Sequence, residues 1–511
     1  MNGFTESTTT ITPASSLPRE VNKFISRMTA VALTVLLTLL GAVHLLRSLG
    51  YIQTAAALPA ATFTVSTLND SGAGSLRQAI LNANATTGPD VIQITAVGTL
   101  QLLSALPIIT ETVTIQGPGM SQLAVAGGSG FRVFESTAVP LTVTDLTVQN
   151  GAPASDPGGG IRSLGTLTLT NVAVLSNTTP VRGGGVFVDG AAWIVNGRFE
   201  NNRALGGTGG GLQSNGRALI TGTQFISNTS TAQGGGAHVA TYSVVRDVNF
   251  EQNRSLFANG GGLYASGIVT LVNASVISNT AFSDGGGMLA FGQAHVYNSR
   301  FINNVCADQG GGMYVGSFLT VKQTAFVGNR GGRGGAIFHG ALNGLLENSL
   351  LAENTATNLG DQMFINSTYP VTLNHVTAVG TTGGMGTGFH VTNTPLLITN
   401  TIIASHTLGI NNLNGSVTQE YNLFFGNGTD IQGAASGGAH TLTDDPRFAN
   451  PAAANYHLRY DSPAIDAGSD TGLLLDYDGD VRPRDNGFDI GFDEGSLLPP
   501  PKELYLPLVT R

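Results

Sequence analysis

The sequence has little charge, little lysine and a single cysteine. Charged residues make up 11% of its 511 residues, and lysine occurs only at Lys23, Lys322 and Lys502, whereas soluble domains average about 25% charged residues. This scarcity excludes a coiled coil, long solvated helices and a charged disordered tail. Cys306 is alone, which excludes an intrachain disulfide. Because no base is paired with it in the sequence, we expect a small buried residue there rather than a nucleophile.

A basic surface is also missing. The chain has 23 Lys and Arg against 32 Asp and Glu, a net charge of −9. Residues 1–61 hold four of these bases and two of the acids, so the remainder carries 19 − 30 = −11. A protein that binds a polyanion needs a cluster of positive charge. The sequence therefore predicts no nucleic-acid partner.

One long apolar run lies near the start of the chain. The run covers residues 28–46. It follows an n-region, residues 1–27, whose second half holds the basic residues Arg19, Lys23 and Arg27, and small residues follow it up to position 61. This order is typical of a secretory signal, but the run is also long enough to span a bilayer. Residues 28–61 are thus predicted to be a signal peptide or an N-terminal anchor, and the only membrane contact. Both readings make the protein secreted or cell-surface.

Glycine is abundant, and much of it lies in a repeated triplet. The chain has 70 glycines, where an average of about 7% would give half as many. The triplets begin at Gly158, Gly183, Gly209, Gly234, Gly260, Gly285, Gly310 and, as Gly-Gly-Ala, Gly334. In the first seven copies an Asn follows the first Gly by 19 residues, three positions after a large apolar residue. These asparagines are Asn177, Asn202, Asn228, Asn253, Asn279, Asn304, Asn329 and, in the eighth copy, Asn354.

This fixed register predicts an all-β fold: a single right-handed parallel β-helix with coils of about 25 residues. Each copy holds three short β-branched stretches, so we expect three strands per coil. A propeller blade needs about 40 residues, and a leucine-rich repeat needs a leucine ladder, so both are excluded. The glycines suit turns and close approach of neighbouring coils. The Asn set should form a buried hydrogen-bonded ladder.

A second set of turn residues stands 13 positions after each first Gly. It comprises Asn171, Asn196, Gly222, Asp247, Asn273, Asn298 and Gln323. Asn, Asp and Gly are the residues that best tolerate the left-handed conformation. We therefore predict a left-handed turn at this point of every coil.

The flanks complete the predicted organisation. Residues 62–157 should hold an N-terminal cap, with a short amphipathic helix at about 75–84, and the first coils, because open β-helix ends need protection. Residues 158–354 hold the eight repeats, and residues 355–440 the last coils. The acidic, turn-rich stretch 441–496 is predicted to be a C-terminal cap. A proline-led tail, residues 497–511, follows it.

These motifs resemble known secreted proteins. The GGA/FxxN repeats resemble those of polymorphic outer membrane proteins, which are surface adhesins. GSLRQAILNAN at 74–84 is similar to the CSLREA cap motif, with Gly74 in place of its Cys. DPRF, SPAIDAG and DIGFDE within 445–494 resemble the C-terminal block of secreted β-helix proteins of the choice-of-anchor type. The resemblance implies fold and export but no activity. The membrane barrel of polymorphic outer membrane proteins has no counterpart in the 15 residues after the cap.

Catalytic residues do not stand out. Polysaccharide lyases of this fold use a Lys or Arg base beside acids, and glycoside hydrolases need paired carboxylates. The repeats offer isolated acids, which we expect to be solvated loop charges: Asp189, Glu200, Asp247, Glu251, Asp284, Asp308, Glu347 and Glu353. The sequence thus favours an adhesin or structural scaffold and assigns no catalytic residue. A lyase or hydrolase remains the alternative.

One acidic turn is a candidate cation site. Asp476, Asp478 and Asp480 alternate around Gly479, and alternate carboxylates at a glycine turn can converge on Ca²⁺. Calcium is the only cofactor that the sequence suggests. The competing interpretation is an acidic turn that is salt-bridged to Arg482 or Arg484.

An aromatic stripe is the candidate binding surface. The residue after each inward-pointing apolar position must point outward, because strand side chains alternate. We call this set the outer column: Arg162, Phe187, Gln213, His238, Tyr264, Leu289, Tyr314 and Phe338. Exposed rings there, above all Phe187, His238, Tyr264, Tyr314 and Phe338, would suit a glycan or a surface protein as partner. The alternative is a purely structural ladder.

Overall fold

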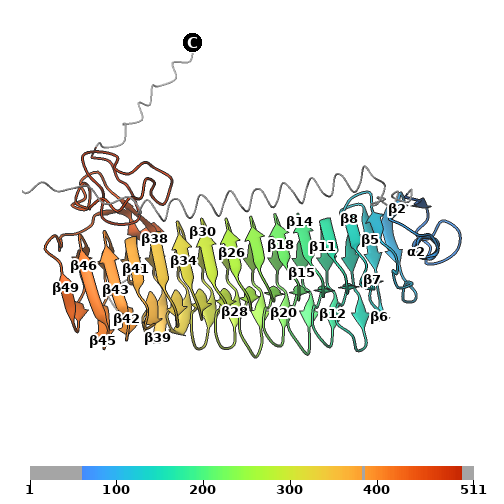
Figure 1. Ribbon diagram of the computed structural model, residues 1–511, viewed down its shortest axis with the longest axis horizontal. Helices are drawn as coiled ribbons and strands as arrows, with labels where there is room; N and C mark the ends of the chain where they lie inside the picture. Colours follow the sequence, from blue (N-terminus) through green and yellow to red (C-terminus); the bar gives the residue numbers. More distant parts are fainter. Residues whose placement is uncertain (1–59, 382–385, 498–511) are drawn as a thin grey trace, which may run out of the picture. The chain divides into compact units, whose positions relative to one another are not determined.

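Strands of successive coils stack in parallel throughout residues 60–381 and 386–497, the part of the chain that the computed structural model describes (Figure 1). The stacking forms a 26-stranded, a 13-stranded and an 8-stranded sheet, and all pairings within these sheets are parallel. The fold is the predicted right-handed parallel β-helix. The predicted signal or anchor and the tail lie almost wholly outside the described residues. Within the described residues, no helix has the length and apolarity needed to cross a membrane.

A central coil shows how the repeat folds. Its strands are β25 (Leu263–Ala265), β26 (Val269–Val272), β27 (Ser275–Ile277) and β28 (Thr280–Ala281). β25 belongs to the 13-stranded sheet, β26 and β27 to the 26-stranded sheet, and β28 to the 8-stranded sheet. The coil thus has four strands rather than the expected three. The extra two-residue strand β28 forms because the chain directly after Asn279 still runs alongside its neighbours.

The predicted turn residues adopt the left-handed conformation. Asn273 has a φ of 53°, and the equivalent residues from Asn171 to Gln323 all lie between 48° and 60°. The first glycine of the triplet also has positive φ, 66° at Gly260. The second glycine of the triplet, Gly261, does not have a positive φ. A Cβ atom at this position would clash with the next coil, because it would lie 2.3 Å from the carbonyl oxygen of Gly286. The triplet is therefore needed both for its turn and for the contact between coils.

The interior is one continuous apolar core. The large residue of each repeat stacks on its equivalent in the next coil, so Phe199, Phe225 and Phe250 have ring centroids 4.8 Å apart. Beside them runs the amide ladder, defined here as the eight asparagines from Asn177 to Asn354. All eight are buried, and the Nδ2 of Asn202 donates to the Oδ1 of Asn228 at 2.9 Å. Cys306 is buried, as predicted.

Both ends of the described chain depart from the repeat. Helix α2 (Leu76–Ala85) packs beside β1 (Thr62–Val65) and β2 (Asp90–Ile94), and Ser75 caps it by accepting from the backbone N–H of Gln78. The 8-stranded sheet ends at β39 (Thr355–Leu359). Later coils are therefore shorter, and His390 pairs with Asn411, 21 residues onward.

The C-terminal segment, residues 441–496, packs against the flank of the coils, next to β38 (Gly344–Ala352) and β41 (Val371–Val379) in Figure 1. It contains the antiparallel pair β50 (Phe448–Asn450) and β51 (Asn455–Leu458). Left-handed turn residues of the coils hold it: Asn348 Nδ2 donates to the carbonyl of Leu475 at 2.6 Å, and Asn400 Nδ2 to that of Ser469 at 2.7 Å. The side chains of Phe492 and Tyr456 pack on an apolar patch of the same coils.

Candidate functional site

The outer column forms as predicted. Arg162 pairs with Phe187, Phe187 with Gln213, and so on strand by strand to Phe338. The column continues beyond the repeats through Phe364, His390 and Asn411. These residues lie on the face of the 13-stranded sheet that is opposite the core.

The expectation that the stripe is exposed is wrong for two of its rings. Phe187 and Phe338 are each only 6% exposed. His238, Tyr264 and Tyr314 are half-buried. Phe338 is covered by its neighbours in the column, because the rings of Tyr314 and Phe364 stack on its two faces. Ser266, just beyond β25, bonds to His238 Nε2 at 2.9 Å.

Ring orientation restricts what the column can bind. Tyr314, Phe338, Phe364 and His390 stack face to face, with centroids 5.0–5.1 Å apart and interplanar angles of 3–15°. Stacking along the helix axis occupies the ring faces, so a sugar cannot lie flat on Phe338. Tyr264 meets His238 edge to face, at 83°. Contact with a ligand would thus use the hydroxyl groups and ring edges of Tyr264 and Tyr314.

A groove opens over the column at Gln213 and His238. Its volume is about 390 Å³, and its polar lining comprises Arg182, Thr208, Gln213, Asn215, His238 and Ser266. Thr208 Oγ1 bonds to Gln213 Oε1 at 2.5 Å, and Gln213 Nε2 donates to Asn215 Oδ1 at 2.8 Å. These bonds hold the amides in fixed orientations, with donors and acceptors along one wall.

The charge of this groove comes from Arg182. Burial, and to a lesser degree the charge of Arg182, lowers the pKa of His238 to about 4, so the imidazole is neutral at pH 7. Arg182 is exposed and has no ion pair among the described residues. The groove therefore offers one free guanidinium among neutral hydroxyl, amide and imidazole groups. That composition suits a hydroxyl-rich ligand.

Two acids expected to be isolated come together farther along the column. Asp284 and Asp308 lie in consecutive loops that are linked by a bond from the Gln309 N–H to Asp284 Oδ1 at 3.1 Å. Burial raises the pKa of Asp284, and the charge of Asp308 adds to this. Both charges raise the pKa of Tyr314 in addition to its burial. Arg333 pairs with Asp308 at 3.4 Å. The stacking of coils produces this cluster, because these loops are about one coil apart in sequence.

The acidic turn does not bring its three carboxylates together. Asp476 is fully buried, and its Oδ1 accepts the backbone N–H groups of Asp478, Gly479 and Asp480 at 2.8–2.9 Å. Its Oδ2 accepts the N–H of Glu494. Asp480 pairs with Arg484 at 3.1 Å, as the alternative interpretation, an acidic turn salt-bridged to an arginine, predicts. Asp476 thus holds the turn together and is not free to bind calcium.

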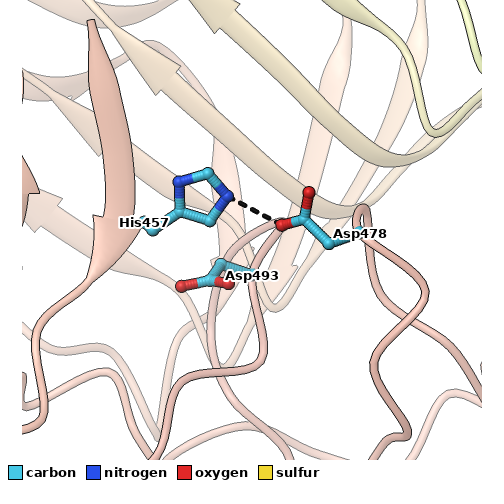
Figure 2. Close-up of side chains that lie close together, drawn as sticks. All are labelled: His457, Asp478 and Asp493. Atoms are coloured by element: carbon cyan, nitrogen blue, oxygen red, sulfur yellow. Dashed lines mark hydrogen bonds and ion pairs between the residues drawn. The ribbon is translucent and has the colours of Figure 1, made fainter. Parts of the chain in front are cut away.

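Asp478 meets a different pair of side chains (Figure 2). His457 Nε2 lies 2.7 Å from Asp478 Oδ2, and Asp493 lies beside both. One ligand atom from each residue lies within 4.8 Å of the other two. His457 comes from β51, Asp478 from the acidic turn and Asp493 from the last loop of the C-terminal segment. Sequence reasoning did not single out His457 or Asp493.

The described chain is, by its strand pairing, a parallel β-helix protein. Its sequence matches no protein-family model and no curated protein. Among solved structures, it is similar to the A-module of the mannuronan C-5 epimerase AlgE6 from Azotobacter vinelandii. The match covers 75% of this chain and all of that module, with 9% sequence identity and a TM-score of 0.26. At these values the match says nothing about activity or ligand, and the fold assignment rests on the strand pairing itself.

Proposed function

We propose that the protein is an exported adhesin or surface scaffold that binds an extended glycan along the outer face of the 13-stranded sheet. The observation that carries the proposal is the polar groove over Gln213 and His238, which continues the line of Tyr264 and Tyr314. Export rests on the apolar segment 28–46 and the resemblance of the repeats to secreted adhesins. A secreted or cell-surface location follows from it.

The geometry of the groove suits sugar hydroxyls. Amides whose orientation is fixed by neighbours bind hydroxyl groups without paying to order themselves. Successive outer-column residues are about 4.8 Å apart, so Tyr264 and Tyr314 are separated by about 10 Å. A chain of sugars lying parallel to the helix axis would meet one column residue per coil. The tyrosines would contribute their hydroxyls, because ring faces along the column are occupied.

A glycan array on the full-length protein tests this proposal. The double variant Tyr264→Phe, Tyr314→Phe keeps the rings and removes two hydroxyls, each of which is worth about 0.5–1.5 kcal/mol. We expect about ten-fold weaker binding. Arg182→Ala, which removes the exposed guanidinium of the groove, should weaken binding further. Tyr369→Ala, at a tyrosine that is 48% exposed and outside the column, is the control. No array signal for the parent protein, or equal binding by parent and both groove variants, would contradict the proposal.

The acid cluster supports a second candidate, a polysaccharide lyase or hydrolase. Asp284 has a raised pKa beside Asp308 and Tyr314, and a carboxyl with a raised pKa can serve as a general acid. If the protein is such an enzyme, it will release reducing or unsaturated sugars from a polysaccharide panel. Asp284→Asn would abolish this release, whereas Asp189→Asn, at an exposed acid beyond the cluster, would not. If no polymer releases sugars, the enzyme candidate is contradicted and only the binding role is left.

A further inference from the structure

The three side chains of Figure 2 have the composition of a transition-metal site. One imidazole nitrogen and two carboxylate oxygens are ligands that Zn²⁺ takes readily, whereas Ca²⁺ prefers oxygen ligands alone. The residues come from three separate segments, at positions 457, 478 and 493. Their meeting therefore depends on the tertiary fold of the C-terminal segment.

The second ring nitrogen of His457 is held as in a metal-bound histidine. Nδ1 lies 2.7 Å from Asn455 Oδ1, and the same oxygen accepts the backbone N–H of His457 at 3.2 Å. The amide therefore presents its oxygen to the ring, and Nδ1 is the donor. A metal-bound histidine characteristically donates its other N–H to an oxygen in this way. Nε2 remains, directed at Asp478.

Asp493 supplies a buried carboxylate with one open oxygen. Asp493 is only 7% exposed, and its Oδ2 accepts the backbone N–H of Leu458 at 2.6 Å. Its other oxygen accepts no hydrogen bond from the described residues, yet is not enclosed. Asp476 and Asp478 add further negative charge near this carboxylate. A bound cation would offset the unfavourable charge.

We propose that His457, Asp478 and Asp493 bind one divalent transition-metal ion of the Zn²⁺ class and so lock the C-terminal segment. The ion would bind the lone pair of His457 Nε2, while Nδ1 keeps its bond to Asn455. In a tetrahedral site with bonds of about 2.0–2.2 Å, two ligand atoms lie about 3.4 Å apart. Atoms at the 4.8 Å limit would therefore have to move together by about 1.4 Å. The half-exposed Asp478 can move this far. The proposal is independent of glycan binding.

Equilibrium dialysis of the full-length, EDTA-treated protein against ZnCl₂ tests the site, with the bound metal counted by mass spectrometry. We expect one Zn²⁺ per chain and a higher melting temperature with zinc. His457→Ala and Asp478→Asn should each weaken binding at least ten-fold. The side chains of His457 and Asp478 are 40% and 46% exposed, so the metal-free variants should melt as the parent does. Asp493→Asn gives a further test, provided that it folds.

His440→Ala is the matched control. His440 also faces a carboxylate, Glu420 at 3.4 Å, and its side chain is 55% exposed, but no second acid joins that pair in the described residues. It should keep zinc binding unchanged. The proposal is overturned if the parent retains no zinc, if His457→Ala binds zinc as the parent does, or if Ca²⁺ occupies the site in preference to Zn²⁺.

Discussion

Replacing one amide of the ladder should destabilise the whole stack of coils. The Nδ2 of Asn228 donates to the carbonyl of Phe199 at 2.8 Å and to Asn253 Oδ1 at 3.0 Å. Its Oδ1 accepts the N–H of Asn202 at 3.1 Å and the Nδ2 of Asn202 at 2.9 Å. Asn228→Ala removes these four bonds. Asn253 Oδ1 keeps another donor, the N–H of residue 228 itself, and Asn202 Nδ2 keeps the carbonyl of Val174.

Two buried groups therefore lose a partner: the N–H of Asn202 and the carbonyl of Phe199. Each such group costs about 1–3 kcal/mol, so we expect the free energy of unfolding to fall by about 2–6 kcal/mol. Asn228→Asp keeps the shape but turns a donor into an acceptor that faces two other oxygens. It should cost at least as much as Asn228→Ala.

Urea unfolding followed by circular dichroism measures this change, and amide exchange should show faster exchange of the Asn202 N–H. Thr231→Ala is the control, because the side chain of Thr231, in the loop after Asn228, makes no hydrogen bond with any other described residue. It should change stability by less than about 0.5 kcal/mol. If Asn228→Ala costs no more than Thr231→Ala, the ladder does not stabilise the fold and the reasoning is refuted.

Two further changes probe the core and the buried histidines. Phe225→Ala should lower the free energy of unfolding by about 3–5 kcal/mol in the same assay, because the ring is fully buried between those of Phe199 and Phe250. Phe257→Ala is the control, and it should cost almost nothing because that ring is 71% exposed. Burial lowers the pKa of His375 to about 3 and that of His406 to about 4, from 6.5. Between pH 6.5 and 4, these two histidines therefore bind protons in the unfolded chain but not in the folded chain. The free energy of unfolding should fall as the pH falls, by about 1.4 kcal/mol per pH unit for each histidine. His406→Gln should reduce this slope; an unchanged slope would contradict the assignment.

The coils could be predicted because their contacts repeat at a fixed distance along the chain. Each amide of the ladder from Asn177 to Asn329 bonds to its equivalent 25 or 26 residues onward, so one period of the sequence contains the contacts between neighbouring coils. The placement of the C-terminal segment has no such period. Gln323 bonds to the carbonyl of Asp476 across 153 residues, and no pattern in the sequence links the two.

One signal for this docking was present in the sequence. From Arg198 onward, the outward position of the third strand is polar through Gln224, Asn249, Ser275 and Arg300. The next four residues at this position are Ala325, Leu350, Thr377 and Ile402, of which only Thr377 is polar. Apolar outward residues must be covered by something. Ala325 and Leu350 pack against Tyr456 and Phe492, and Ile402 packs against other residues of the C-terminal segment. The pattern indicates where the covering begins, although not which segment provides it.

The candidate sites were harder to predict. Alternation placed the outer column correctly, but it does not show how far each ring is buried. Phe338 is buried between the rings of Tyr314 and Phe364, which stack on it face to face. The cluster of His457, Asp478 and Asp493 combines a residue of β51 with two residues from separate turns. Asp476 looked like the best ligand of its turn because side-chain type alone does not show that three backbone N–H groups already occupy it.

The constant spacing between triplet and ladder makes the coils interchangeable. Each coil presents the same donors to one neighbour and the same acceptors to the other. Deleting residues 260–284 would join Asn259 to Gly285, and the amide of Asn253 would then meet Asn304 in place of Asn279. A gene for such a chain can gain or lose whole coils by recombination within its own repeats. The reach of the protein would then change in steps of about 4.8 Å, with its two ends, and whatever each end binds, left as they are.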